Sequence, residues 1–138
     1  MKKQHVAKQI FVNLPVKDLN KTMKFFAKLG FRFNKQFTDK NAACMIIGEN
    51  IYSMLITEKF FKTFITKKIA NSRKTVEVLT ALQVESRAKV DKIVNTALKA
   101  GAKEPKKFPD HGWMYSRDFE DLDGHIWEVF WMDPSKAK

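Results

Sequence analysis

The sequence has little of several features that particular classes of protein require. Its 138 residues include one cysteine, five glycines, four prolines and three histidines. The single cysteine, Cys44, excludes an internal disulfide and a cysteine metal cluster, and its apolar neighbours indicate a buried thiol. No apolar run approaches the roughly 20 residues that cross a bilayer. No apolar segment follows the basic N-terminus, as a signal peptide would require. We therefore expect a cytoplasmic protein that does not associate with membranes.

Acidic residues are also scarce, with 15 Asp and Glu against 26 Lys and Arg, so the net charge is +11. The basic residues are mostly lysines that are spread along the chain. Nucleic-acid grooves tend to gather Arg as well as Lys beside exposed aromatic side chains. The dispersed lysines instead predict a solvated surface and no specific nucleic-acid binding. The net charge favours an anionic ligand or partner over a cationic one.

The chain does contain a pattern that occurs twice. Residues 14–18 end a predicted strand and lead into a helix that stops at Gly30, and residues 82–86 lead in the same way into a helix that stops at Gly101. Matched strands follow at residues 49–55 and 123–129. We predict a single domain, residues 1–138, made of two repeats at about 8–57 and 75–133. A Phe- and Lys-rich connector at 58–74 joins them.

Each repeat is predicted as a strand, a helix and three further strands. In the first repeat, residues 31–37 alternate between apolar and polar and predict a strand. In the second repeat, residues 103–108 predict an edge strand that is interrupted by Pro105. The pair Asp123-Gly124 predicts a tight turn before the last strand.

Three segments together carry a family resemblance. They are FVNLPVKDL at residues 11–19, FFAKLGF at 25–31 and DLDGHIWEV at 121–129. In this order and spacing the chain resembles the vicinal oxygen chelate superfamily, which includes glyoxalase I, extradiol dioxygenases, and the bleomycin and fosfomycin resistance proteins. The resemblance implies an α+β fold of paired βαβββ modules that form curled mixed sheets. It also implies a homodimer.

The resemblance further implies a cup in which the first and last strands of each module supply ligands to a divalent metal. The corresponding positions in this chain are Phe11, Ser53, Leu79 and Glu128. Only Glu128 is a good ligand, whereas sites of this type need at least three protein donors. A one-residue slip in register, for example to Met54, restores no donor, and no histidine matches a ligand position. We therefore expect no metal and no other cofactor.

An apolar cup around one acid predicts a binding site for a small molecule that is mostly apolar or anionic. Glu128 is the candidate catalytic residue, because apolar surroundings raise the pKa of a carboxyl group and suit it to act as a general base. The predicted ligand-binding residues are Phe11, Asn13, Ser53, Leu79, Ala81, Tyr115, Arg117 and Ile126. Alternation leaves open whether Tyr115 or Ser116 accompanies Arg117 in the site.

Three functions are compatible with these residues. The first is a metal-free protein that binds a small molecule. The second is a glyoxalase- or dioxygenase-type enzyme that holds a metal through other ligands. The third is a metal-independent isomerase or lyase in which Glu128 moves a proton.

Overall fold

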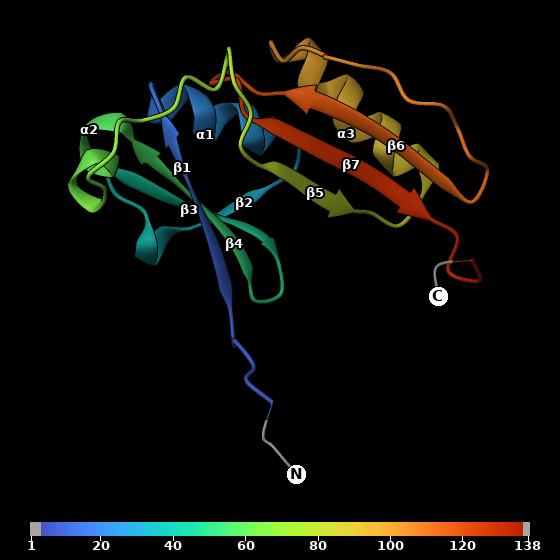
Figure 1. The fold of residues 1–138 in the computed structure, drawn as a ribbon, viewed down its shortest axis with the longest axis horizontal. Helices are drawn as coiled ribbons and strands as arrows, with labels where there is room; N and C mark the ends of the chain where they lie inside the picture. Colours follow the sequence, from blue (N-terminus) through green and yellow to red (C-terminus); the bar gives the residue numbers. More distant parts are fainter. Residues whose placement is uncertain (1–3, 137–138) are drawn as a thin grey trace. The chain divides into compact units, whose positions relative to one another are not determined.

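The computed structural model describes residues 4–136 and divides into two compact units, the first ending at Ile69 and the second beginning at Ala70. Each unit contains one mixed β-sheet and a helix that follows its first strand (Figure 1). The predicted α+β class with mixed sheets is therefore confirmed. No helix within residues 4–136 has the length and apolar character needed to cross a membrane.

The first unit builds a four-stranded sheet in the order β1-β4-β3-β2, with β1 parallel to β4 and the other pairs antiparallel. Its elements are β1 (Ile10–Val16), α1 (Leu19–Lys28), β2 (Arg32–Asn34), η1 (Lys35–Phe37), β3 (Ala42–Gly48), β4 (Ile51–Thr57), α2 (Glu58–Phe61) and η2 (Lys62–Phe64). Phe25 and Phe26 of α1 are buried, as are Met45 of β3 and Leu55 of β4. These side chains form the core because α1 contacts both β3 and β4.

Local signals explain where α1 begins and ends. The side chain of Asp18 accepts a hydrogen bond from the backbone N–H of Lys21 at 3.1 Å and so caps the first turn. Gly30 follows the helix with φ of 100°, a conformation that residues with a side chain rarely adopt. Both ends agree with the prediction from the sequence.

The strand predicted at residues 31–37 is shorter than expected. Only Arg32–Asn34 pair with β3, and a 3₁₀ turn replaces the rest. The side chain of Asn34 accepts a hydrogen bond from the N–H of Gln36 at 3.0 Å, which starts this turn. A local side-chain bond thus outcompetes the strand that the alternation predicted.

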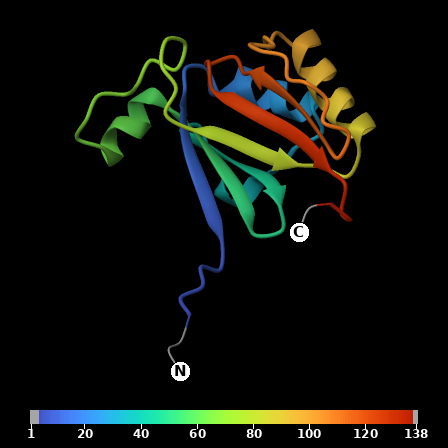
Figure 2. The same ribbon diagram turned by 45° about the vertical axis from the view of Figure 1, so that its right-hand side comes forward.

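The second unit builds a three-stranded sheet in the order β5-β7-β6, with β5 parallel to β7 and β6 antiparallel to it. Its elements are β5 (Leu79–Gln83), α3 (Arg87–Lys99), β6 (Met114–Glu120) and β7 (Ile126–Met132). Ser86 caps α3 by accepting a hydrogen bond from the N–H of Lys89 at 3.1 Å. Figure 2 shows α3 lying along one face of this sheet, where Val90, Val94, Phe119, Trp127 and Val129 are fully buried.

The edge strand predicted at residues 103–108 does not form within the described residues. A single bridge between Lys103 and Glu120 stands in its place. Pro105 lacks the N–H that a ladder needs, and the pairing ends just before it. The second unit therefore has one strand fewer than the repeat pattern predicts.

The turn between β6 and β7 is held by buried groups. Asp121 is 5% exposed and accepts hydrogen bonds from the N–H of Asp123 at 2.9 Å, the N–H of His125 at 3.0 Å and Nε1 of Trp127 at 2.9 Å. Gly124 has φ of 90°, and a Cβ there would lie 2.9 Å from the backbone N of Arg73. This turn determines how β6 and β7 align, and thereby which of their side chains face each other.

Candidate functional site

The second sheet has one face toward α3 and one face away from it. Tyr115 and Arg117 of β6 bond to Asp91 of α3, and they alternate with the residues of the opposite face. We call the face turned away from α3 the distal face. It carries Leu79, Ala81 and Gln83 from β5, Ser116, Asp118 and Glu120 from β6, and Ile126, Glu128 and Phe130 from β7.

Two carboxyl groups stand opposite each other at the centre of the distal face. Asp118 of β6 and Glu128 of β7 are cross-strand partners in the antiparallel ladder, which brings their side chains together. Asp118 is 5% exposed, and its Oδ1 atom has no hydrogen-bond partner among the described residues. Burial, and then the neighbouring charge of Glu128, raise the pKa of Asp118 to about 6. The pair can therefore hold a proton close to neutral pH.

An apolar row lies beside this carboxyl pair. Leu79 and Ile126 are partners in the parallel ladder, and Ala81 and Glu128 form the next row on the same face. Successive rows on one face are separated by about 7 Å, since a strand rises about 3.3 Å per residue. Leu79 is 52% exposed, so its side chain is accessible for contact. The distal face thus combines an accessible apolar surface with two acids.

The first sheet has a comparable accessible face. Phe11 of β1 is 45% exposed and stacks on Tyr52 of β4, with ring centroids 4.8 Å apart and an interplanar angle of 14°. Asn13 is the partner of Met54 in the next row, and its Nδ2 atom donates to the carbonyl of Phe11 at 3.4 Å. Phe11 and Asn13 therefore share one face, as the alternation predicted.

Ser53 does not share that face. The register pairs Phe11 with Tyr52, so Ser53 lies on the opposite, buried side, where its hydroxyl donates to the carbonyl of Val12 at 2.9 Å. The expected correspondence of Ser53 with Glu128 is therefore one residue out, and a one-residue slip turns a side chain to the other face. Glu128 lies one row from Leu79, and the residue in the same relation to Phe11 is Met54.

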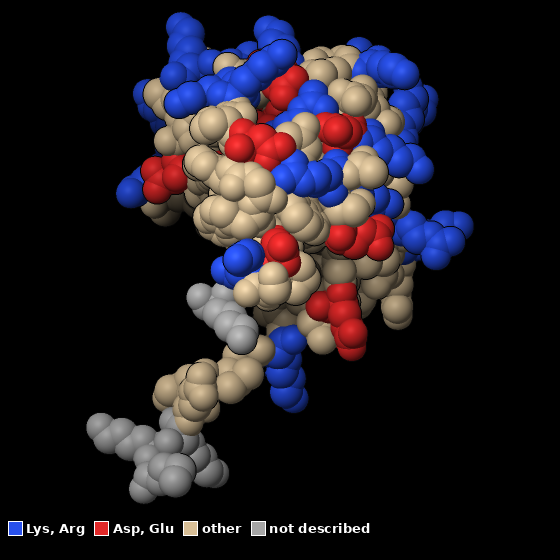
Figure 3. Space-filling view, turned by 90° about the vertical axis from the view of Figure 1, so that its right-hand side faces the viewer, with Lys and Arg blue, Asp and Glu red and all other residues tan. Residues whose placement is uncertain are grey.

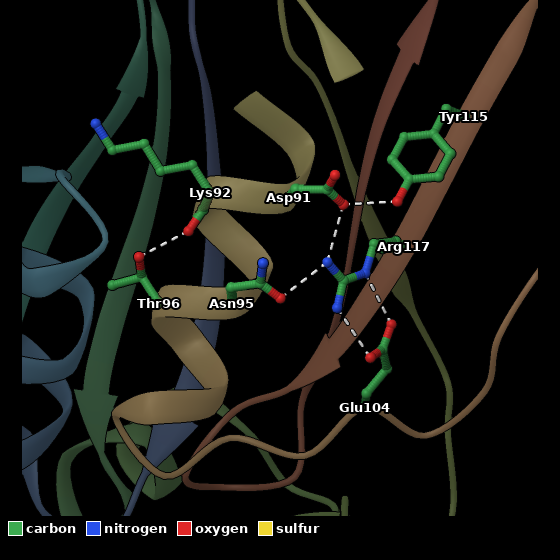
Figure 4. Close-up of polar contacts among 7 residues, drawn as sticks. All are labelled: Asp91, Lys92, Asn95, Thr96, Glu104, Tyr115 and Arg117. Carbon is green, nitrogen blue, oxygen red and sulfur yellow. Dashed lines mark hydrogen bonds and ion pairs between the residues drawn. The ribbon is translucent and has the colours of Figure 1, made fainter. Parts of the chain in front are cut away.

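Tyr115 and Arg117 also lie away from the distal face, in a polar network with α3 (Figure 4). Arg117 donates to Glu104 through Nε at 2.9 Å and Nη2 at 3.0 Å, and through Nη1 to Asp91 at 3.0 Å. The Tyr115 hydroxyl donates to the same Asp91 oxygen at 2.6 Å. Hydrogen bonding from Arg117 lowers the pKa of Glu104, and burial raises the pKa of Tyr115. These two residues hold α3 to the sheet, and Ser116 takes the position on the distal face.

Asp118 is the residue that the sequence reading missed. The sequence does contain a feature that predicts it. Asp118 and Glu128 are equally far from Asp123 in the predicted Asp-Gly turn, so a hairpin at this turn makes them cross-strand partners. Of the other predicted residues, the structure places Leu79, Ala81, Ile126 and Glu128 together on the distal face.

Comparisons with known proteins identify the family of this arrangement. A family model of the glyoxalase/bleomycin resistance protein/dioxygenase superfamily matches residues 4–129. The chain belongs to this superfamily. No curated protein matches it. The resemblance that was read from the three sequence segments is thereby confirmed.

Solved structures share the superfamily fold. A hypothetical protein from S. aureus is 29% identical, with a TM-score of 0.75 and coverage of 92% of this chain and 95% of that one. A glyoxalase/bleomycin resistance protein/dioxygenase family enzyme from Burkholderia phytofirmans PsJN is 16% identical, with a TM-score of 0.72 and coverage of 88% and 96%. The fosfomycin resistance protein FosX from Listeria monocytogenes is 18% identical, with a TM-score of 0.69 and coverage of 97% and 100%. The last two are similar in fold alone.

The divalent metal that the superfamily implies does not fit the donors of this member. With the register corrected, the four positions read Phe11, Met54, Leu79 and Glu128. Adding Asp118 supplies a second carboxylate but no third donor. Within the described part of the chain, no group of three or more His, Cys, Asp and Glu side chains is placed to hold a metal ion.

Proposed function

We propose that this member of the superfamily binds a small, mostly apolar molecule on its distal face, without the metal that the superfamily implies. The observation that carries the proposal is the row of exposed Leu79 and half-buried Ile126 beside the pair of buried Asp118 and half-buried Glu128. The lining of a small-molecule site is typically mostly apolar, with a few precisely placed polar groups. Leu79 and Ile126 would contact the apolar part of the ligand, and Asp118 and Glu128 would bind its polar group.

The charge expected of the ligand differs from the one that the net charge of the chain predicts. The net charge of the chain favoured an anionic molecule, but the distal face carries the carboxyl groups of Asp118, Glu120 and Glu128. Like charges at contact distance disfavour an anion there. We therefore keep the apolar character of the predicted ligand and drop the anionic one.

Benzyl alcohol, a neutral apolar probe, is expected to bind the distal face and to bind about fivefold more weakly to Leu79→Ala, because the variant loses apolar contact area. Binding would be measured by titrating ¹⁵N-labelled protein and following the amide signals of β5 and β7. Phe64→Ala is the matched control, since Phe64 is 64% exposed in η2 of the other unit. Equal weakening in both variants, or near-stoichiometric Ni, Zn, Mn or Fe in the purified protein, would contradict the proposal.

A second candidate function is proton transfer by Glu128 in a metal-independent isomerase or lyase. The paired Asp118 favours it, because two carboxyl groups in different environments can divide the acid and base roles. Glu128 would take a proton from the carbon next to a carbonyl group, and protonated Asp118 would donate a hydrogen bond to the resulting enolate oxygen. The proton returns to carbon when the enolate collapses.

The coupling between these two acids can be measured directly. Glu128→Gln is expected to lower the pKa of Asp118 from about 6 toward its ordinary value without reaching it, since burial is the larger cause of the shift. Carboxyl ¹³C signals followed against pH would report this. Glu120→Gln is the control, because Glu120 is not among the charges that shift Asp118. An unchanged Asp118 pKa in Glu128→Gln would show that the pair does not interact.

The same Glu128→Gln variant separates a binder from an enzyme. In a pure binder, benzyl alcohol binding survives and no proton exchange is seen in either protein. In an enzyme, the wild type exchanges the α-protons of dihydroxyacetone with D₂O and the variant does not.

Homodimerisation, a cytoplasmic location and ligand contacts by Phe11 and Asn13 stay predictions from the sequence and the resemblance.

A further inference from the structure

The distal face has a charge opposite to that of the protein as a whole. The chain carries 26 Lys and Arg, yet the positions of β5, β6 and β7 on this face hold three acids and no basic residue. Arg117 precedes Asp118 in β6 but faces α3, where it bonds to Asp91 and Glu104. At the edge of the distal face, Lys103 pairs with Glu120. Elsewhere the basic side chains are scattered and interrupted by acidic ones, as Figure 3 shows for one face. The strands of the distal face therefore carry an excess of acids, with Lys103 as the neighbouring base at the edge.

A second, independent observation points to a missing hydrogen-bond donor. Asp118 is 5% exposed, and its Oδ1 atom has no partner among the described residues. A buried carboxylate oxygen without a donor is costly, so native structures rarely leave one unless a water, an ion or a ligand completes it. The partner in the ladder, Glu128, is itself an acceptor when ionised and adds repulsion.

We infer that the ligand of the distal face carries an ammonium group, which it places between Asp118 and Glu128 while its apolar part lies over Leu79 and Ile126. This inference rests on the proposed function and names the class of ligand. An ammonium group has several N–H donors and a positive charge, so it can bond to both carboxylates at once. The spacing of about 7 Å between the two rows suits a ring joined to an amine by a short linker.

The net charge of +11 does not oppose this inference at contact distance. Exposed charges are screened over about 8 Å at physiological ionic strength. The scattered lysines therefore slow the approach of a cation without outweighing two carboxylates that touch it. A divalent metal fits less well, because the pair supplies two donors where such sites need at least three.

Three probes that share one ring test the inference: benzylamine, benzyl alcohol and benzoate. Each is titrated into ¹⁵N-labelled protein with EDTA present, so that no metal mediates binding. Benzylamine is expected to bind at least about tenfold more tightly than benzyl alcohol, and benzoate more weakly than either. Asp118→Asn and Glu128→Gln should each lose most of the preference for benzylamine. Asp133→Asn removes a negative charge that lies beyond the end of β7 and is bonded to Ser135, and this variant should keep the preference.

The outcomes separate this inference from the proposed function. If benzoate or benzyl alcohol binds as tightly as benzylamine, or if both carboxyl variants keep the preference, the ammonium inference is overturned and the apolar site stands. If none of the three probes shifts the signals of the distal face, both are overturned. The dispersion of the amide spectrum shows in each case that the variant is folded.

Discussion

Asp118→Asn is expected to stabilise the protein at pH 8 by about 1 to 3 kcal/mol and to change its stability little at pH 4. The reason is that Asp118 is buried, lacks a hydrogen-bond partner at Oδ1 and faces Glu128. Asparagine has nearly the same shape and carries no charge, so it removes the cost of burying the ionised form. Functional sites typically contain residues that lower the stability of the folded protein.

The sign follows from the pKa of Asp118, which is raised from 3.8 to about 6 in the folded protein. Between these values the folded state holds a proton that the unfolded state has lost, so the stability contributed by this group falls as pH rises from about 4 to 6 and stays lost above. The variant does not lose this stability as pH rises. The free energy of unfolding in urea, measured for both proteins from pH 4 to pH 8, tests the difference. Asp121 titrates in both proteins, so its contribution cancels when the two are compared.

Asp133→Asn provides a control of opposite sign. Hydrogen bonds from Ser135 lower the pKa of Asp133, so its ionised form is favoured in the folded protein. Replacing it should leave stability unchanged or reduce it as pH rises. An Asp118→Asn variant that is less stable than the wild type at pH 8 would refute the assignment of Asp118 as an uncompensated buried acid.

Asp121→Ala is expected to destabilise the protein by about 3 to 5 kcal/mol, because three donors lose their acceptor at once and at least one of them is buried. They are the backbone N–H groups of Asp123 and His125 and the indole N–H of Trp127. Trp127 is fully buried, so its indole N–H cannot replace the lost hydrogen bond with one to water. Chemical denaturation gives the loss in free energy, and indole fluorescence reports the changed environment of Trp127.

Asp39→Ala is the matched control for this effect. Asp39 is exposed and accepts hydrogen bonds from the N–H of Asn41 at 2.8 Å and of Ala42 at 3.0 Å in a similar turn. Because that turn is open to solvent, water can replace the lost acceptor, and the cost should stay near 1 kcal/mol. Equal losses in the two variants would show that burial of the Asp121 turn contributes nothing.

The sequence predicted the local structure well where a short-range signal existed. The two helices were bounded by their own caps and glycines, Asp18 with Gly30 and Ser86 with Gly101. Strands β4 and β7 overlap the matched strands predicted at residues 49–55 and 123–129. The errors came at Asn34, whose side chain starts a turn, and at residues 103–108, where proline leaves one bridge in place of a strand.

By itself, the sequence determined the superfamily and the α+β class, since these depend on residue identity and local pattern. Only the tertiary structure decided which side chains share a face. The pairing of the strands places Ser53 on the buried side of the first sheet and Arg117 on the side of α3. It also makes Asp118 and Glu128 cross-strand partners. The physical reason is that strand side chains alternate, so a shift of one residue in the pairing exchanges the two faces of a sheet.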